Sequence, residues 1–252
     1  MGAAAARVAA ELGAEVVVMD VADVAFPVKK KIKVDLRDRP STDSALEQIG
    51  GPVHAVFSCA GVADGTAGLM KINFIAQRHL IDRLVDGGLL GRGGAIAMIS
   101  SVAGMMWQKN LATVLEFLGN EDWDSAAAWI ESHPGTDNYS FSKQAINTYV
   151  AHEALALLKR GIRINAVLPG PTETPLARAN ADLWLTFGAD YREAAGVPVL
   201  TPEQVAHAMA FLCSPAASGI CGTTLVVDSG QVGAGISGAF ESPIIKILAG
   251  VR

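Results

Sequence analysis

Short apolar runs alternate along the chain with longer segments in which apolar residues recur every three or four positions. Runs of the first kind predict buried parallel strands, and segments of the second kind predict amphipathic helices. The expected strands are 15–19, 31–35, 53–58, 94–100, 163–168 and 223–227, and the expected helices are 3–12, 69–86, 137–160, 202–213 and one opening at Ser41. This alternation predicts an α/β fold built on a doubly wound parallel sheet. Without an internal repeat or a linker, residues 1–252 are expected to form a single domain.

Residues 105–136 interrupt the alternation. Two groups of apolar side chains at helical spacing lie there: Leu111, Val114, Leu115, Phe117 and Leu118, then Trp123, Ala127, Trp129 and Ile130. They predict a helical insertion of two short amphipathic helices. So much apolar surface must be covered, and three partners remain open: the body of the same domain, a substrate, or a second subunit.

Composition excludes several functional classes. The chain has 252 residues, half of them hydrophobic, and a formal charge of −5, which argues against nucleic acid as a partner. No apolar run reaches the roughly 18 residues of a membrane span, and the Ala-rich start lacks the charged leader of a signal peptide. Three cysteines without a C-x-x-C pair fit a reducing cytoplasm rather than a disulfide framework. The five histidines are scattered without zinc spacing, so no metal is expected.

One pair of polar residues carries the clearest chemical signal. Tyr139 and Lys143 are four residues apart in the long predicted helix, so their side chains share one face. An ammonium beside a phenol favours the phenolate, and the pKa of Tyr139 is expected to fall below the ordinary value near ~10. Such a phenol takes a proton from an alcohol, or gives one to a carbonyl, near neutral pH.

Further candidates stand at the ends of the first predicted strands, where open parallel sheets bind ligands. Asp20 can accept hydrogen bonds from both hydroxyls of an adenosine ribose, which favours NAD over NADP. Asp35 and Leu36 follow the next strand, where they can contact adenine. The small residues 59–61 let a cofactor approach the backbone closely. The basic run 29–33 is either a solvated loop or a clamp for a 2′-phosphate.

Hydroxyl groups end two later strands. Ser100 and Ser101 follow one strand, and a hydroxyl there can donate to a substrate oxygen as negative charge develops on it. Thr172 and Thr174 follow Pro169-Gly170, where they can fix the carboxamide of a nicotinamide. Asn73 lies in mid-helix, where asparagine is a poor helix former, and marks either a surface position or a kink with a bound water.

Together these residues resemble the short-chain dehydrogenase/reductase family. The motifs that carry the resemblance are Ile99-Ser100-Ser101, Tyr139-x-x-x-Lys143, Asn165-x-x-x-Pro169-Gly170-x-x-x-Thr174 and Val227-Asp228-x-Gly230. Their order agrees with the family from Gly2 to about Gly230. The resemblance implies a Rossmann-like fold and an NAD-dependent oxidoreductase in which hydride passes between nicotinamide C4 and a carbinol carbon.

The resemblance also assigns roles. Tyr139 is implied as the general acid/base, Lys143 as the group that lowers its pKa and binds the nicotinamide ribose, and Ser101 as the group that orients the substrate oxygen. Asn73 is implied as a fourth member that holds a water linking Lys143 to solvent. The residues expected to bind the cofactor are Gly2, Asp20, Asp35, Leu36, Cys59, Ala60, Gly61, Tyr139, Lys143, Pro169, Gly170, Thr172 and Thr174.

The chain departs from the family pattern in two ways. Ser101 and Tyr139 lie 38 residues apart (139 − 101), more than twice the usual separation, because of the insertion. This arrangement is similar to that of bacterial 3α-hydroxysteroid dehydrogenases/carbonyl reductases, and coniferyl-alcohol dehydrogenases have a comparable insert. In the steroid enzymes the insert blocks the family's usual helix-bundle dimer face, so the resemblance implies a homo-oligomer that is a dimer rather than a tetramer.

The second departure is at the start. The family begins with a strand and T-G-x-x-x-G-x-G; here Gly2 matches the last glycine, and the first strand and two glycines are missing. The neighbours of that strand are then expected to keep unpaired backbone groups and exposed apolar faces. Two accounts remain open, a start codon placed too far downstream or a chain that folds with weakened cofactor binding. As it stands, we expect poor stability and weak NAD binding.

The substrate pocket is expected between 60–67, 102–107 and 175–200, the last carrying Leu183, Trp184, Phe187 and Tyr191. Apolar walls of this kind suit an uncharged, bulky alcohol or ketone, with a hydroxysteroid as the expected example. The alternatives are an aryl or allylic alcohol dehydrogenase of the coniferyl type and a non-catalytic dinucleotide-sensing or scaffold protein. The tail 241–252 either docks on a partner subunit or stays loose.

Overall fold

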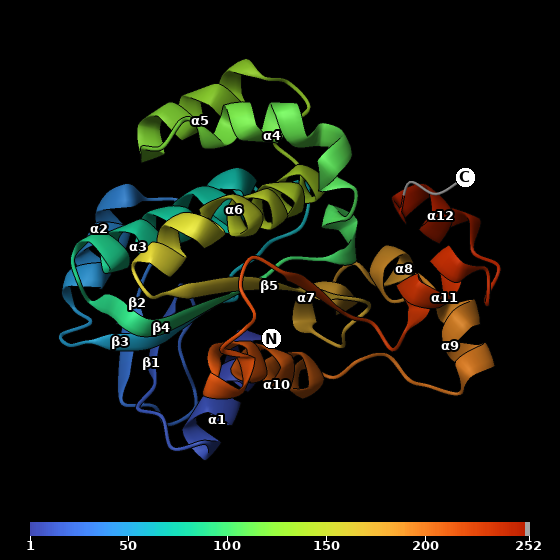
Figure 1. The fold of residues 1–252 in the computed structure, drawn as a ribbon, viewed down its shortest axis with the longest axis horizontal. Coiled ribbons are helices and arrows are strands. Elements are labelled where there is room, and N and C mark those ends of the chain that lie inside the picture. The colour runs from blue at the N-terminus through green and yellow to red at the C-terminus, as the bar shows by residue number, and fades with distance from the viewer. Residues whose placement is uncertain (250–252) are drawn as a thin grey trace.

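The computed structural model describes residues 1–249 and has an α/β fold in which every strand pairing is parallel (Figure 1). The strands are β1 Val17–Asp20, β2 Lys30–Lys33, β3 Val53–Ser58, β4 Leu90–Ile99, β5 Arg163–Pro169 and β6 Thr224–Val227. Each lies within a few residues of a strand expected from the sequence. Short β-branched runs thus sufficed to locate them, because a strand covered on both faces is apolar along its length.

Helices cover both faces of the sheet (Figure 1). They are α1 Gly2–Glu11, α2 Arg39–Glu47, α3 Ala76–Asp86, α4 Leu111–Leu118, α5 Trp123–Ser132, α6 Tyr139–Lys159, α7 Pro175–Arg178, α8 Ala181–Trp184, α9 Ala189–Ala195, α10 Pro202–Cys213, α11 Gln231–Ser237 and α12 Pro243–Ala249. Successive residues of β4 point to opposite faces: Ile96 and Met98 join the cluster under α3 and α6, whereas Ala97 and Ile99 join the one over α1 and α10.

The sheet is divided. β1 pairs with β2, and β3, β4, β5 and β6 pair in that order, but within residues 1–249 no pairing joins β1 to β3. Val17, Val18 and Met19 are only half-buried, as are Val56 and Phe57 of β3. The expected unpaired edges and partly exposed apolar faces are therefore present on β1 and β3 within the described residues.

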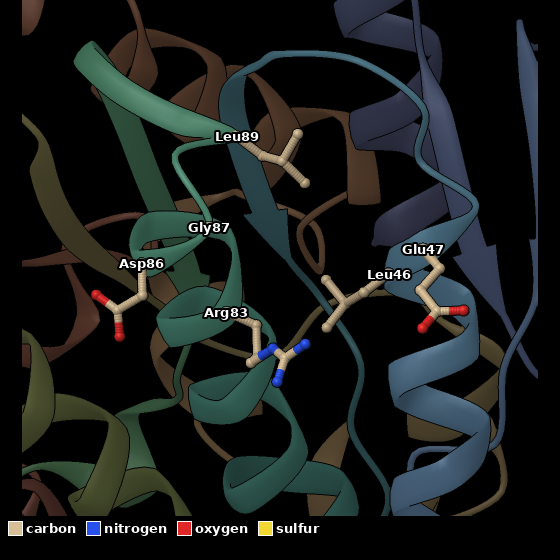
Figure 2. Close-up of a pocket in the computed structure, with 6 residues that line it drawn as sticks. All are labelled: Leu46, Glu47, Arg83, Asp86, Gly87 and Leu89. Carbon is tan, nitrogen blue, oxygen red and sulfur yellow. The ribbon is translucent and has the colours of Figure 1, made fainter.

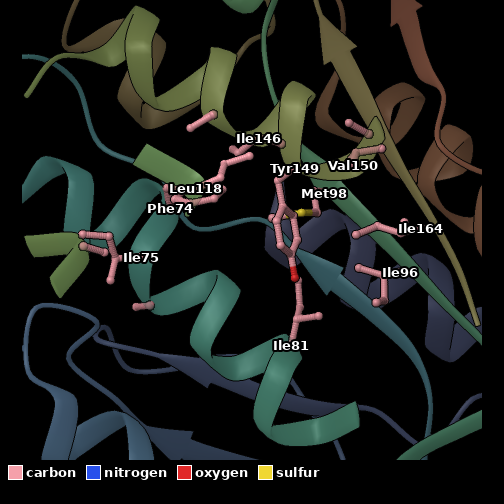
Figure 3. Close-up of a cluster of buried hydrophobic side chains, with 14 of the residues drawn as sticks. Phe74, Ile75, Ile81, Ile96, Met98, Leu118, Ile146, Tyr149, Val150 and Ile164 are labelled. Atoms are coloured by element: carbon pink, nitrogen blue, oxygen red, sulfur yellow. The ribbon is translucent and has the colours of Figure 1, made fainter. Parts of the chain in front are cut away.

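The insertion packs on its own domain. Side chains of α4 and α5 join the main apolar cluster together with residues of α3 and α6, which Figure 3 shows around Phe74 and Tyr149. The ring of Phe117 lies 5.5 Å from that of Phe74 and 5.7 Å from that of Phe141, between ring centroids. Of the three partners left open for this surface, the body of the same domain covers the buried face.

The described part of the tail also packs on its own chain. Ile245 of α12 is fully buried, and residues 250–252 lie outside the described residues. Ile245 therefore attaches α12 to its own chain, and docking of the exposed residues Ile244 and Ile247 on a partner subunit stays a prediction. None of the helices in the described part of the chain is long and apolar enough to cross a membrane.

Candidate active site

The first turn of α6 is fixed at two points. The Asn138 side chain accepts a hydrogen bond from the Phe141 backbone N–H at 2.9 Å, which caps the helix. The Tyr139 backbone N–H donates to the Asp64 carboxylate at 2.7 Å, although the two residues are 75 positions apart in the sequence. Tyr139 is thus held in place before its side chain makes any contact.

The two serines after β4 face different partners. The Ser100 hydroxyl is buried and donates to the backbone oxygen of Lys143 at 3.1 Å, so it serves the packing of α6 on β4. The Ser101 hydroxyl accepts from the Ala103 backbone N–H at 3.1 Å and also hydrogen-bonds the phenol of Tyr139. Of the pair, Ser101 is therefore the one brought to Tyr139.

Lys143 lies deep beside Tyr139. Its ammonium is 5.3 Å from the centroid of the Tyr139 ring and donates to the backbone oxygen of Ile99 at 2.9 Å. The side chain is 2% exposed, and none of the ion pairs among the described residues involves it. Two of its three N–H donors remain available to a ligand.

Burial, not the neighbouring ammonium, dominates the pKa of Tyr139. Desolvation raises the pKa of this phenol, the hydrogen bond from Ser101 lowers it, and the charge of Asp64 raises it further. Burial also lowers the pKa of Lys143 to about 8. The expected fall in the pKa of Tyr139 is therefore wrong for this protein without a ligand, because the low-dielectric surroundings penalise the charged forms of both groups.

Asn73 marks a kink, as one of its two interpretations predicted. It is fully buried in a π-helical turn, Lys71–Ile75, that precedes α3. Its amide accepts from the Val62 backbone N–H at 2.8 Å and donates to the Val62 oxygen and the Ser142 hydroxyl, both at 3.1 Å. These bonds join the segment after β3 to α6, and whether Asn73 also holds a water stays a prediction.

Small residues line the space beside Lys143. A Cβ added to Gly61 would lie 3.7 Å from the Lys143 ammonium and 3.8 Å from the Asn73 oxygen. Gly2, at the start of α1, packs against Cys59, since its own added Cβ would come within 3.2 Å of the Cys59 Cβ. The end of β3 thus brings α1, Asn73 and Lys143 around one point, with Ala60 between Cys59 and Gly61.

The candidates for adenosine binding lie on the smaller part of the sheet. Asp20 ends β1, is exposed, and accepts from the Ala22 backbone N–H at 2.8 Å. Asp35 is engaged by the Arg37 guanidinium, which lowers the pKa of that carboxyl to about 2. Leu36, the residue after Asp35, is partly buried and packs against the apolar cluster that contains Ile32 and Val34. The second oxygen of Asp20 therefore has no hydrogen bond among the described residues, whereas Asp35 already has a cationic partner.

The lysines of the basic run are surface residues with local partners. Lys29 pairs with Glu15 at 2.5 Å and Lys33 with Asp23 at 2.9 Å. These pairs favour the solvated interpretation of the run over a clamp for a 2′-phosphate.

The hydroxyls after β5 take part in local structure. The Thr172 hydroxyl donates to the Gly170 oxygen at 2.9 Å, and the Thr174 hydroxyl caps α7 by accepting from the Ala177 N–H at 3.1 Å. Gly170 lies so close to Asp228 that a Cβ on it would come within 2.9 Å of the Asp228 Cβ. Pro169-Gly170 thus ends β5 against the end of β6, and contact of either threonine with nicotinamide stays a prediction.

The residues present fit the nicotinamide end of a dinucleotide better than its diphosphate and adenosine. The Lys143 ammonium with free donors, the Ser101 hydroxyl and the space beside Gly61 fit the nicotinamide end. The first N–H groups of α1 have no side-chain cap, which suits a diphosphate. Only Gly2 stands for the glycine-rich loop, however, and Asp20 lies across the division between β1 and β3.

Two contacts of Tyr139 could not be predicted from any motif in the sequence. Asp64 touches Tyr139 from a loop with no recognisable motif. The indole of Trp184, on α8, lies 4.9 Å from the Tyr139 ring between centroids. Trp184 was expected in the pocket wall, but nothing in the spacing predicted its contact with the phenol.

One pocket lies away from these residues. It has a volume of about 470 Å³ and lies between the ends of α2 and α3, lined by Leu46, Glu47, Arg83, Asp86, Gly87 and Leu89 (Figure 2). None of the candidate residues lines it. Within residues 1–249 no group of three or more His, Cys, Asp or Glu side chains is placed to hold a metal ion.

Known proteins resemble the chain in sequence. A family model described as enoyl-(acyl carrier protein) reductase matches residues 124–231. Cis-4-hydroxycyclohexanecarboxylate dehydrogenase of Sinomonas cyclohexanicum is 31% identical over 244 residues, and the match covers 91% of each protein. Coniferyl-alcohol dehydrogenase of Pseudomonas sp. (strain HR199 / DSM 7063) is 25% identical over 239 residues, again 91% of each.

A solved structure resembles the fold. The 3-alpha-hydroxysteroid dehydrogenase from Pseudomonas sp. B-0831, complexed with NADH, superimposes with a TM-score of 0.75 at 25% identity. The match covers 96% of this chain and 95% of that one. The described elements, from α1 to the C-terminal helices, therefore have counterparts in a dinucleotide-binding protein.

Proposed function

The chain belongs to the short-chain dehydrogenase/reductase family, and we propose that it is an NAD(H)-dependent oxidoreductase that interconverts a secondary alcohol and a ketone. One observation carries the proposal: a phenol, a hydroxyl and a buried ammonium, those of Tyr139, Ser101 and Lys143, converge beside the end of β4. These groups suit acid/base chemistry on a carbinol, since a hydroxyl can orient the oxygen while the phenol moves the proton.

In this proposal NAD supplies the hydride acceptor, and the chain supplies position and proton traffic. Ser101 donates to the substrate oxygen and Tyr139 exchanges a proton with it. The buried Lys143 ammonium opposes protonation of the phenolate and holds the nicotinamide ribose through its free N–H donors. Asn73 fixes the segment around Val62 against α6, and this holds the part of α6 that carries Tyr139 and Lys143 in position.

Asp20 supports NAD rather than NADP. Its carboxylate stands at the end of β1, where it can accept from both hydroxyls of the adenosine ribose and would repel a 2′-phosphate. The solved relative with bound NADH supports the same choice. Because β1 is not paired to β3, we expect NAD to bind weakly, which a fluorescence titration with NADH measures.

We propose a bulky, apolar secondary alcohol or ketone as substrate, with hydroxysteroids first. The lid segment 175–200 places Trp184 and Phe187 near Tyr139 and Val102, which supports an uncharged ring. The similarity to a coniferyl-alcohol dehydrogenase supports an aryl or allylic alcohol as the second candidate. A non-catalytic dinucleotide sensor stays the alternative from another class.

NADH absorbance at 340 nm, followed with hydroxysteroids, ring alcohols and coniferyl alcohol, tests the proposal. We expect turnover with at least one ring alcohol, abolished in Tyr139→Phe while circular dichroism shows the fold unchanged. Ser101→Ala should lower kcat by on the order of 100-fold, as for loss of an oxyanion donor, whereas Ser100→Ala should alter stability more than rate. NADH binding without turnover of any of these alcohols would favour the sensor instead.

A further inference from the structure

The last two helices return to the candidate site. α11 and α12 lie beside α8 and α9 in Figure 1, on the side of the molecule that carries the lid. Ile245 of α12 is fully buried, whereas Ile244 is 54% and Ile247 70% exposed. Among the side chains of α12 that the structure describes, Ile245 is therefore the large one that anchors the helix to the rest of the protein.

A glycine makes room for that anchor. A Cβ added to Gly235, on α11, would lie 2.7 Å from the Ile245 Cβ and 2.6 Å from its Cγ2. No real Cβ approaches that closely, so any larger residue at this position would push Ile245 out of its place. The two helices are thus fitted to each other at one point.

The anchored side chain reaches two parts of the site. Ile245 forms an apolar cluster with Val102 and Val232, and Met105 and Phe187 pack against this cluster. Val102 directly follows Ser101, and Phe187 belongs to the lid between α8 and α9. α12 therefore touches the segment that carries the catalytic hydroxyl and the segment that covers the pocket.

The lid has further attachments to the same C-terminal segment. The Tyr191 hydroxyl donates to the Ser229 oxygen at 2.9 Å, and the Tyr191 ring meets the Phe240 ring edge-on at 5.3 Å between centroids. Gly188, at φ 67°, lies against Gln231 so closely that a Cβ would be 1.9 Å from the amide nitrogen. The position of the lid is thus set by α11 and α12.

The far end of the lid rests on the phenol. Trp184, three residues before Phe187, places its indole 4.9 Å from the Tyr139 ring. The turn between them contains only two residues, so Trp184 and Phe187 are closely connected along the backbone. The contacts form one series from α12 through the lid to Tyr139.

We propose that Ile245 is a positioning residue that holds residues 181–195 of the lid, with Trp184 against Tyr139. The inference rests on the proposed function, in which Tyr139 exchanges a proton with a ring alcohol. An apolar wall held in place lowers the cost of ordering the lid when substrate binds, so Ile245 acts on substrate affinity. It touches neither the substrate oxygen nor the cofactor, and the chemical step does not depend on it.

The test compares Ile245→Ala with Ile247→Ala, the exposed isoleucine of the same helix. Truncation of the buried side chain leaves a cavity against Phe187 and Val102. We expect amide hydrogen exchange in residues 181–195 to rise on the order of tenfold in Ile245→Ala, with exchange in β4 and β5 unchanged. Ile247→Ala should leave all of these rates at the wild-type value.

Kinetics give the second readout, with the ring alcohol that turns over best. Ile245→Ala should raise KM on the order of tenfold and leave kcat within about twofold, because only binding is affected. Ile245→Val should restore most of both readouts. Gly235→Ala should reproduce the loose lid by displacing Ile245 from the other side.

Two results would overturn the inference: equal lid exchange in Ile245→Ala and Ile247→Ala, or a fall in kcat at unchanged KM. Hydrogen exchange needs no turnover, so it separates the two proposals. Selective lid exchange in a protein that turns over no alcohol would uphold the role of Ile245 in holding the lid and defeat the proposed reaction.

Discussion

Burial sets the direction of the pKa shifts of two residues in the site, Lys143 and Tyr139. Lys143 carries its charge in surroundings that lower its pKa to about 8, with one backbone oxygen as its described acceptor. Burial raises the pKa of Tyr139 for the same reason. A buried charge without a counter-charge costs stability, and a protein keeps one where a ligand uses it.

Replacement of Lys143 by methionine should therefore stabilise the ligand-free protein. A folded-state pKa below the ordinary value of 10.5 means that wild-type stability rises as pH increases from about 8 to 10.5. We expect Lys143→Met to gain about 2–3 kcal/mol at pH 7, after the lost Ile99 hydrogen bond, and little at pH 10.5. Urea unfolding at both pH values measures this, and an equal gain at each would contradict it.

Asp64 offers a second prediction at this scale, because its charge opposes ionisation of Tyr139 while its oxygen holds the Tyr139 N–H. Asp64→Asn keeps an acceptor and removes the charge. The pKa of Tyr139 should fall, and the pH profile of kcat/KM for alcohol oxidation should move to lower pH. Asp137→Asn, which removes a carboxylate bonded to the Met70 N–H, should leave the profile in place.

At the scale of elements, one buried arginine fastens the insertion. The Arg78 guanidinium, on α3, donates to the backbone oxygens of Leu118 and Asn120 at the end of α4, and lies 5.6 Å from the Phe74 ring centroid. The end of α4 is thus capped from a different element. The sequence predicted the two inserted helices but not this bond between segments 40 residues apart.

Loss of that cap should loosen the insertion. Arg78→Met leaves two buried oxygens without a donor, and we expect it to cost about 2–3 kcal/mol of unfolding free energy. Hydrogen exchange over 111–132 should rise before that of the sheet. Arg83→Met, on an exposed face of the same helix, serves as the control and should change neither quantity. Unchanged protection of 111–132 in Arg78→Met would refute the assignment.

At the scale of the whole molecule, the insertion affects which surface is available for an oligomer. α4 and α5 bury their apolar faces against α6 and the turn before α3. The resemblance to the steroid enzymes implies that an insert at this place blocks the helix-bundle dimer face of the family. We therefore expect a dimer. Sedimentation equilibrium should give twice the chain mass of 26.2 kDa, and a species of four times that mass would contradict the prediction.

The sequence by itself determined the order of the strands and of the longer helices, since each follows from apolar periodicity within about ten residues. It did not predict the short helices α7, α8, α9, α11 and α12. It also placed Asp20 and Ser101 at the ends of strands and Tyr139 and Lys143 on one face of a helix.

The tertiary structure decided what depends on burial and on contacts between distant segments. The pKa of Tyr139 rises where the local pair predicted a fall, because desolvation is a property of the whole surroundings. Asp64 reaches Tyr139, and Ile245 reaches Val102, only after the chain has folded. Periodicity records which face of an element is buried, but not which residue of another element meets it.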